Sequence, residues 1–390
     1  MRRNLKMMDK PLFFLIIIMS LFGLFMIFSA SYVKASLIEG NTYKYLIRQG
    51  SIIIIGFLAY FIILNIPLSK YKKIINVILY GIIGLLIYLI ANGKVINGSR
   101  SWLDFGYFNL QPSELAKTVL ILYMAIYYST RKFTEDNYIK ILKPFIFGAI
   151  IVGLVFMQPD LGTALIIMAI MVATYLAVPI KKEFNLKIFK VVSFIVGSIV
   201  LLVVISSMSG KSILNESQKQ RLNFFNPCDR YTEVGPGYQV CNGYIAINGG
   251  GLFGKGIGNS TQKYLYLPES HTDFIFPIII EELGVLVGIL ILLMYFYIIY
   301  RILLISKASN GLMGGIIGYG ISSYLFFQTL VNIGGVLGLI PLTGVPLPFL
   351  SYGGSFTLNL FISFALIQRV SIENNLFKKE EAIRNKIREQ

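Results

Sequence analysis

Long apolar stretches recur along this chain and constrain its fold more than any other feature. Pro11–Tyr32, Ile52–Ile66 and Phe274–Tyr300 are examples. A helix needs about 20 residues to cross the hydrocarbon core of a bilayer. The other fold that can span lipid is a β-barrel, whose strands alternate apolar and polar residues. The run Leu12–Met19 shows no such alternation. We therefore predict an all-α polytopic membrane protein.

The composition agrees with this prediction. Only 14% of the residues are charged, compared with about 25% in soluble domains, and the mean hydropathy is +0.70. We predict about ten transmembrane helices. They lie near residues 11–33, 46–66, 74–91, 112–129, 144–158, 160–178, 188–208, 274–300, 312–333 and 349–368. The first follows a basic segment, as in a signal peptide, but it is too long and lacks a clean cleavage pattern, so we expect it to be retained.

The basic residues indicate the orientation. Of the 35 Lys and Arg residues, 23 lie in the two tails and in alternate loops, whereas the short loops on the opposite side hold five. These five are Lys34, Lys44, Arg48, Lys94 and Arg100. Cytoplasmic loops carry the excess of positive charge, so we place both termini, residues 1–10 and 369–390, in the cytoplasm. The net charge of +16 thus reflects membrane topology, and we expect no nucleic acid partner.

One long segment departs from the pattern of short connections. Residues 209–273 form a large extracytoplasmic loop, rich in Gly, Asn and Tyr, within what we interpret as a single membrane domain covering residues 1–390. Loops of this length are usually functional or disordered. Its glycine-rich part, Gly249–Gly258, offers backbone N–H groups for an anion. A second outer segment, Gly334–Gly354, is uncharged and joins the last two spans.

Acidic residues at membrane depth are functional candidates by default. Here they occur in Gln111–Lys117, Gln158–Gly162, Leu267–Phe276 and Glu281–Gly284, with Gly98–Leu103 close by in the chain. All but Glu281–Gly284 fall at the predicted outer boundary, and Glu281 lies only about 12 Å along a helix from Asp273. Together they predict one site at the outer leaflet.

Several of these motifs together resemble the FtsW/RodA/SpoVE (SEDS) family. The similar segments are Leu267–Phe276, Glu281–Gly284, Pro112–Lys117 and Pro346–Ser355, which occur in the family's order over nearly the whole chain. Tyr238-Gln239 and Gly258–Lys263 are more similar to the division branch. The resemblance implies a bacterial cytoplasmic membrane enzyme that polymerises lipid II into peptidoglycan strands. It also implies a class B penicillin-binding protein as transpeptidase partner, together with other division or elongation membrane proteins. The family's essential aspartate corresponds to Asp273, and its important tryptophan to Trp102.

The residues fit that chemistry independently. Glycosyl transfer from a diphosphate donor needs a carboxylate to take the acceptor's hydroxyl proton and cations to stabilise the leaving diphosphate. Asp273 is the candidate base of an inverting displacement, and Arg221, Lys255 and Lys263 are candidate cations. We expect no metal ligand set, although a divalent cation (Mg or Mn) could share the charge. The candidate substrate-binding residues are Trp102, Arg100, Glu114, Lys117, Asp160, Arg221, Lys263, His271 and Glu281.

Structural roles compete with these interpretations. Asp273 and Asp160 each stand where a helix begins and are also candidate N-caps. Glu114 and Lys117 lie one turn apart and are equally suited to neutralising each other. A structural hydrogen bond is the alternative for His271, and a place in the interfacial aromatic belt is the alternative for Trp102. For the whole protein, a lipid II flippase and a scaffold are the alternatives, but the inner halves of the spans hold almost no charge for a polar path.

Cys228 and Cys241 are the chain's only cysteines, and both lie in the large outer loop. The outer side of the membrane is the oxidising side, where disulfides persist. A bond between them would close a ring of about 14 residues, worth roughly 3 kcal/mol in the chain-entropy model. We predict a disulfide, with two separately packed thiols as the alternative.

Overall fold

The computed structural model describes residues 2–96, 99–106, 108–131, 138–180, 190, 221, 224–230 and 235–389. Helices dominate it: α1 (Arg2–Met7), α2 (Lys10–Leu37), α3 (Lys44–Leu64), α4 (Leu68–Asn92), α5 (Pro112–Ser129), α6 (Tyr138–Met157), α7 (Leu161–Leu176), α10 (Pro236–Gly250), α11 (Ile275–Leu283), α12 (Val285–Lys307), α13 (Leu312–Val336) and α14 (Gly354–Arg388). Within the described part, seven helices are long and apolar enough to cross a membrane. The predicted all-α polytopic fold is thus correct, and the predicted span at 188–208 lies outside the described residues.

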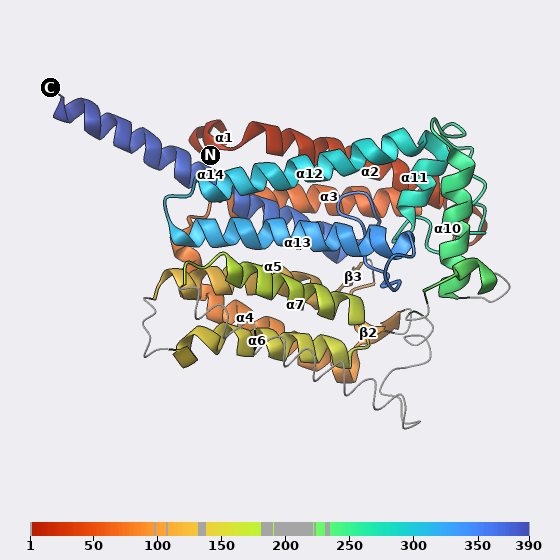
Figure 1. Cartoon of the computed structure of the whole chain (residues 1–390), viewed down its shortest axis with the longest axis horizontal. Coiled ribbons are helices and arrows are strands. Elements are labelled where there is room, and N and C mark those ends of the chain that lie inside the picture. The colour runs from red at the N-terminus through yellow and green to blue at the C-terminus, as the bar shows by residue number, and fades with distance from the viewer. Residues whose placement is uncertain are drawn as a thin grey trace.

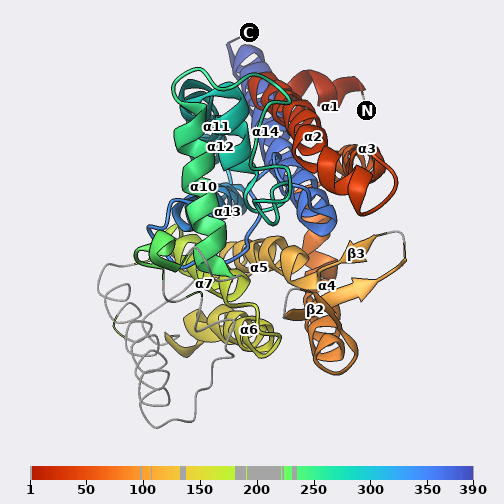
Figure 2. The ribbon, with the colours of Figure 1, turned by 90° about the vertical axis from the view of Figure 1, so that its right-hand side faces the viewer.

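The long helices run side by side along one axis of the molecule (Figure 1). Both termini lie at one end of this bundle, and α10 crosses the opposite end, next to α11. Viewed from that end, α10 passes in front of α12 and α13, while α4, α5, α6 and α7 form the lower part of the molecule (Figure 2). We call the end that carries α10 the α10 end. Because α10 belongs to the large outer loop, we expect the site predicted at the outer leaflet to lie at this end.

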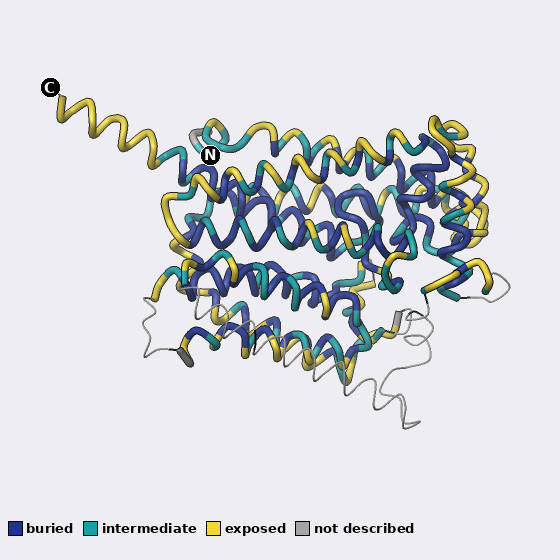
Figure 3. Tube along the Cα trace, viewed as in Figure 1, coloured by how far each residue is buried: buried dark blue, intermediate teal, exposed yellow. Residues whose placement is uncertain are grey.

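Helix α14 is the centre of the bundle. It packs against α3, α5, α12 and α13, and it is the most buried of the candidate spans, whereas its last turns project from the bundle and are exposed (Figure 3). Its buried polar side chains are paired across helices: Thr118 donates to Asn359 Oδ1 at 2.7 Å and Gln49 donates to Thr357 Oγ1 at 2.9 Å. Such hydrogen bonds help to hold helices together where burial of apolar surface cannot.

The predicted span 274–300 is wrong as a single helix. It is two helices, α11 and α12, separated by Gly284, whose φ is +87°. A Cβ at Gly284 would lie 2.2 Å from the carbonyl oxygen of Leu252, so only glycine fits at this break. At this break, a backbone N–H finds its partner in the loop that begins at Gly251: the N–H of Val285 donates to the carbonyl of Gly251 at 2.9 Å. Pattern alone did not reveal the break because the sequence stays apolar across it.

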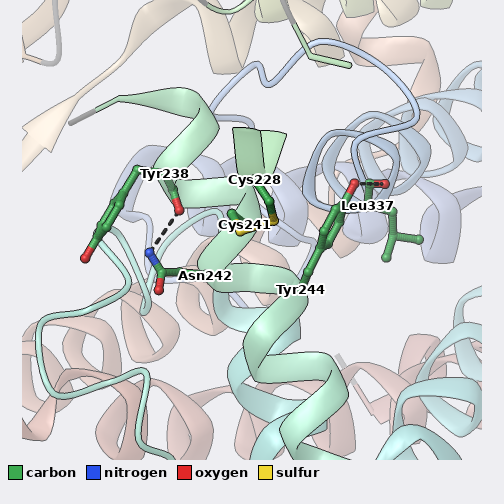
Figure 4. The surroundings of a disulfide bond; sticks show 6 residues. All are labelled: Cys228, Tyr238, Cys241, Asn242, Tyr244 and Leu337. Atoms are coloured by element: carbon green, nitrogen blue, oxygen red, sulfur yellow. Dashed lines mark hydrogen bonds between the residues drawn. A yellow bond between two sulfur atoms is a disulfide. The ribbon is translucent and has the colours of Figure 1, made fainter. Parts of the chain in front are cut away.

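Smaller elements cover the α10 end of the bundle. Strands β1 (Lys94–Ile96), β2 (Ser99–Asp104) and β3 (Asn109–Leu110) form an antiparallel sheet in the order β1-β2-β3. The large outer loop contains the 3-10 helix η2 (Pro227–Arg230) and α10. The hydroxyl of Tyr244 in α10 donates to the carbonyl of Leu337, just after α13, at 2.9 Å (Figure 4). The described part of this loop is therefore folded against the bundle.

Cys228 of η2 and Cys241 of α10 are joined by a disulfide (Figure 4). Their Cα atoms lie 5.0 Å apart, within the range that a disulfide requires. This is the pairing that the sequence predicts. The bond ties the segment that leads into α10 to the second turn of that helix.

Candidate functional site

Asp273 lies in the turn that precedes α11, and three hydrogen bonds fix the backbone around it. Asn332 of α13 donates to the carbonyl of Asp273 at 2.8 Å, Ser351 donates to the carbonyl of Thr272, and the N–H of Tyr352 donates to the carbonyl of His271 at 2.9 Å. Two of these donors belong to the Gly334–Gly354 segment. The two outer segments that the sequence singled out therefore form one structure.

The side chain of Asp273 does not cap α11. The N-cap residue of that helix is Phe274, and no side chain caps it. Asp273 is only 7% exposed, and its Oδ1 accepts a hydrogen bond from the hydroxyl of Thr272 at 3.0 Å. The capping alternative for Asp273 is therefore wrong, and a buried carboxylate is left with little to compensate its charge.

Burial is the main influence on the ionisation of Asp273. Desolvation, together with the neighbouring carboxylate of Glu269, raises the pKa of Asp273 to about 7, although the hydroxyl of Thr272 and the guanidinium of Arg221 act in the opposite direction. A carboxylate whose pKa lies near neutral pH is well placed to act as a general base, since it can both accept and release a proton.

Arg221 is a cation whose charge acts on Asp273. Its Nη1 donates to the carbonyl of Thr343 at 3.4 Å. A Cβ built on Gly344 would lie 4.0 Å from Arg221 Nη1 and 3.8 Å from Asp273 Oδ2, so the two groups face the same small space. Gly344 has a φ of +71° and contributes no side chain to that space. Arg221, one of the three candidate cations, thus lies beside the same space as Asp273.

His271 is buried among aromatic rings. Its ring lies 4.5 Å from that of Tyr45 and 5.6 Å from that of Tyr352, measured between centroids. Burial, assisted by the positive charge of Lys34, lowers its pKa to about 3, so it is neutral at physiological pH. Its Nδ1 has no hydrogen-bond partner among the residues that the structure describes. Packing rather than a hydrogen bond from Nδ1 therefore holds this ring in place.

Glu281 anchors the glycine-rich loop. Its carboxylate accepts hydrogen bonds from Lys255 Nζ at 2.7 Å, from both the N–H and the hydroxyl of Thr261 at 3.1 and 2.7 Å, and from Ser260 and the N–H of Gln262. The N–H groups of Lys255 and Gly256 donate to the carbonyls of Glu281 and Glu282. These two N–H groups are already bonded within the protein and are therefore not available to an anion.

Lys263 is committed to Glu282. The two side chains are 5% and 0% exposed and their charged atoms lie 2.8 Å apart. The hydroxyl oxygen of Ser29 of α2 lies 2.8 and 2.7 Å from the two oxygens of Glu282 and donates its proton to that carboxylate. The expectation that Lys263 binds the donor's phosphates therefore needs correction, because its charge is neutralised inside the protein. Glu281, another candidate substrate residue, is 0% exposed and serves the same junction.

A second buried ion pair lies deeper in the bundle. Lys117 Nζ lies 2.8 Å from Glu114 Oε1 and also donates to Gln328 Oε1 at 3.1 Å. Gln328 in turn donates to the carbonyl of Pro346 at 3.1 Å. The neutralising alternative for Glu114 and Lys117 thus agrees with the structure. Through Gln328 the pair also supports the Gly334–Gly354 segment beneath Asp273.

Asp160 is the N-cap of α7. Its Oδ1 accepts from the N–H of Thr163 at 3.1 Å, and its Oδ2 accepts from Gln111 Nε2 at 2.9 Å. Arg100 and Trp102 both lie on β2: Arg100 is exposed and donates to the carbonyl of Ile90 at 3.4 Å, whereas Trp102 is half-buried. The structure thus gives Asp160 a structural partner on each oxygen and places Trp102 on a strand that contacts β1, β3, α4 and α5.

Residues that the sequence analysis did not select complete this arrangement: Glu269, Thr272, Gln328, Asn332 and Glu282. A signal was present for the two on α13, since an amide side chain inside an apolar span is a candidate for a specific role. Glu269 lies in the motif that carries Asp273 but two residues before the histidine, where nothing marked it as a neighbour. Its carboxylate lies close to Asp273, with Thr272 between them, only because the chain turns between these residues.

The chain matches the family model for the cell cycle proteins FtsW, RodA and SpoVE over residues 9–376. The protein belongs to this family. The probable peptidoglycan glycosyltransferase FtsW of Pseudoalteromonas translucida is 35% identical over 379 residues, which are 95% of this chain and 91% of the relative. The probable peptidoglycan glycosyltransferase FtsW of Bacillus subtilis is 34% identical over 393 residues, 97% of this chain and 95% of the relative.

Solved structures show the same fold. A chain from a peptidoglycan synthase complex that coordinates polymerization and crosslinking matches with a TM-score of 0.71 and 24% identity, over 94% of this chain and 98% of that one. The rod shape determining protein RodA of Thermus thermophilus matches with a TM-score of 0.66 and 24% identity, over 94% of this chain and 97% of that one. The resemblance found in the motifs of the sequence thus extends to the whole chain.

Proposed function

We propose that this protein is a peptidoglycan glycosyltransferase that polymerises lipid II, in the division branch of its family. The relatives named FtsW support this, because they share about a third of their residues with this chain over nearly its full length. The observation that carries the proposal within the molecule is Asp273: a buried carboxylate, uncommitted to helix capping, that faces the same space as an arginine.

The reaction follows from that arrangement. Asp273 accepts the proton of the acceptor sugar's hydroxyl as the oxygen attacks the anomeric carbon of the donor. The bond to the diphosphate breaks as the new bond forms, so one displacement inverts the centre without a covalent enzyme intermediate. A base with a pKa near 7 suits this step. Arg221 stabilises the negative charge that develops on the departing diphosphate.

Lipid II carries two phosphates, and the described residues offer few free cations beside Asp273. Lys255 and Lys263 are paired with Glu281 and Glu282. In the described part of the chain, no group of three or more His, Cys, Asp or Glu residues could hold a metal ion. We therefore expect a divalent cation such as Mg²⁺ or Mn²⁺, where one takes part, to arrive with the diphosphate. EDTA titration of the activity tests this expectation.

We further propose that the α10 end faces outward and that both termini are cytoplasmic. The distribution of basic residues supports this orientation, and so does the disulfide near α10, since disulfides persist on the outer side. The partner that we propose is a class B penicillin-binding protein. The support is the fold shared with a component of a complex that coordinates polymerization and crosslinking.

The test is Asp273→Asn in the purified protein, with and without a cognate transpeptidase. Asparagine keeps the size of the side chain and removes the base. With fluorescent lipid II in detergent, we expect glycan strands from the wild type and at least a hundredfold less from Asp273→Asn, with the same elution profile for both proteins. Wild-type polymerisation by Asp273→Asn would disprove the catalytic assignment. Transport of lipid II across vesicles without polymerisation would instead favour the flippase.

A further inference from the structure

The side chain of Thr272 occupies an unusual place between two carboxylates. Its hydroxyl oxygen lies 2.8 Å from Glu269 Oε2 and 3.0 Å from Asp273 Oδ1, and also 3.0 Å from the carbonyl oxygen of Glu269. A hydroxyl has one proton to donate and can accept in return. It therefore cannot donate to both carboxylates at once, and the arrangement is satisfied when one of the two carries a proton and donates it to Thr272.

The two carboxylates differ in how they meet solvent and charge. Asp273 is 7% exposed. The side chain of Glu269 is 31% exposed, and its Oε1 lies 3.9 Å from Lys34 Nζ of α2. Glu269 is thus the accessible end of the trio and has a cation beside it, whereas Asp273 is the buried end. A proton taken up at Asp273 has a short route to water through Thr272 and Glu269.

The backbone of Glu269 has an unusual conformation at this contact. Glu269 has a φ of +56°, in the left-handed region that residues other than glycine rarely adopt. Its carbonyl accepts hydrogen bonds from the N–H groups of Thr272 at 3.1 Å and Phe274 at 3.2 Å, which close the turn and set its side chain beside Thr272. Such strain persists only where the surrounding structure holds it, and it gathers at functional sites.

We propose that Thr272 and Glu269 form a proton relay that carries the acceptor's proton from Asp273 to solvent. This rests on the proposed function. After attack, the protonated carboxyl of Asp273 donates its proton to Thr272 Oγ1 while the Thr272 hydroxyl proton passes to Glu269 Oε2. Glu269 then releases a proton to water, and Asp273 is again a carboxylate. Both residues act through Asp273 and are positioning residues, since neither has to touch the substrate.

The relay makes a prediction about pH because of the charges around it. Glu269 and Arg221 are the charged groups that influence Asp273, and Lys34 of α2 and the phenol of Tyr45 of α3 are those that face Glu269. The negative charge of Glu269 raises the pKa of Asp273. Removing that charge therefore moves the acid limb of kcat/KM to lower pH while the loss of the relay lowers kcat.

The test compares Thr272→Val, Thr272→Ser and Glu269→Gln in the lipid II polymerisation assay. Valine keeps the shape of threonine without its hydroxyl, and serine restores the hydroxyl. We expect kcat to fall about tenfold in Thr272→Val and Glu269→Gln and to stay near wild type in Thr272→Ser. Imidazole buffer should raise the rate of Glu269→Gln with its concentration, because it replaces the lost proton acceptor, and should leave the wild type unchanged. Asp229→Asn, which removes an exposed carboxylate of η2, is the matched control.

The outcomes separate the relay from the proposed function. If Asp273→Asn is inactive while Thr272→Val has wild-type rates and an unshifted pH profile, the relay is wrong and the base assignment stands. A slow Glu269→Gln without buffer dependence and without a shifted acid limb would show a structural role and also overturn the relay. Should Thr272→Val fail to fold, Glu269→Gln decides alone. Activity in Asp273→Asn would remove the base on which the relay depends.

Discussion

The acidic residues near the two ends of α11 differ in how fully their charges are compensated. Within the helix, Glu281 and Glu282 are fully buried. Glu281 is matched by Lys255 and several hydroxyl and N–H donors, and Glu282 by Lys263 and the hydroxyl of Ser29. Before the helix begins, Asp273 is nearly as buried, yet it has one hydroxyl donor, a second carboxylate nearby and an arginine facing the same space. A buried charge with full compensation is a structural element, because its cost has been offset in the folded state. One that stays under-compensated has a perturbed pKa and is available for chemistry.

The largest effect that this contrast predicts is on activity. Asp273→Asn should abolish polymerisation and at the same time stabilise the protein. The pKa of Asp273 is raised from 3.8 in its ordinary environment to about 7 in the fold. Its contribution to stability is present below pH 3.8 and is lost as the pH rises through about 7, because the buried side chain must then ionise. The gain from Asp273→Asn should therefore be larger at pH 8 than at pH 5, by roughly 2–3 kcal/mol.

Thermal unfolding in detergent at the two pH values measures that gain. Glu281→Gln, examined in parallel, should lose stability at both. If Asp273→Asn destabilises the protein at pH 8 as much as Glu281→Gln does, the contrast between the two clusters is wrong.

The next effect concerns stability at the second cluster. Lys263→Ala leaves Glu282 buried without its cation, and breaking a buried pair from one side costs roughly 3–5 kcal/mol. We expect a large drop in the unfolding temperature and in the yield of folded protein. The double variant Lys263→Met/Glu282→Gln, which removes both charges, should recover most of the loss. A single variant that folds normally but binds lipid II weakly would return Lys263 to the diphosphate site.

A smaller effect is expected for Arg221. Its guanidinium lowers the pKa of Asp273, so Arg221→Ala should raise that pKa and move the acid limb of kcat/KM to higher pH, opposite in sign to Glu269→Gln. Turnover should also fall, by about tenfold, from the loss of charge stabilisation on the diphosphate. Measuring kcat/KM from pH 5.5 to 8.5 tests both expectations. An unshifted profile would place Arg221 outside the electrostatic reach of Asp273.

The smallest effect on catalysis is expected for the disulfide. Cys228→Ser/Cys241→Ser should leave the pH profile unchanged, since neither cysteine is among the groups that influence Asp273. It should loosen the segment before α10, with a loss of up to about 3 kcal/mol for a ring of this size. Limited proteolysis with and without reductant measures that loosening. A shifted pH profile in the double variant would show that the brace reaches the catalytic turn.

Much of the fold could be predicted from the sequence, because a lipid bilayer strongly limits the structures that can span it. Apolar length located most of the spans, and the span predicted at 112–129 matches α5 to the residue. The break at Gly284 was not readable, since it depends on the carbonyl of Leu252 lying against it. The extent of α14 was underestimated because a helix continues past the apolar stretch when its polar turns find solvent.

For the candidate site, the structure places Asp273 and Arg221, two residues selected from the sequence, beside the same glycine, Gly344. The ion pairs of Lys255 and Lys263 were not predicted, because nothing in the sequence of the outer loop shows that these lysines have acidic partners. Their partners, Glu281 and Glu282, lie 26 and 19 residues later in another element, and no periodicity connects them. Pairing over such distances is set by tertiary structure alone.

Helix α14 is longer than a bilayer core is thick. Its 35 residues make a rod of about 52 Å at 1.5 Å per residue, whereas the hydrocarbon core of a bilayer is about 30 Å thick. Because its buried part occupies the centre of the bundle and its last turns project from it (Figure 3), roughly 20 Å of helix extends beyond the length that a bilayer core requires. The direction of these exposed turns is therefore fixed by the same helix that packs at the core of the protein.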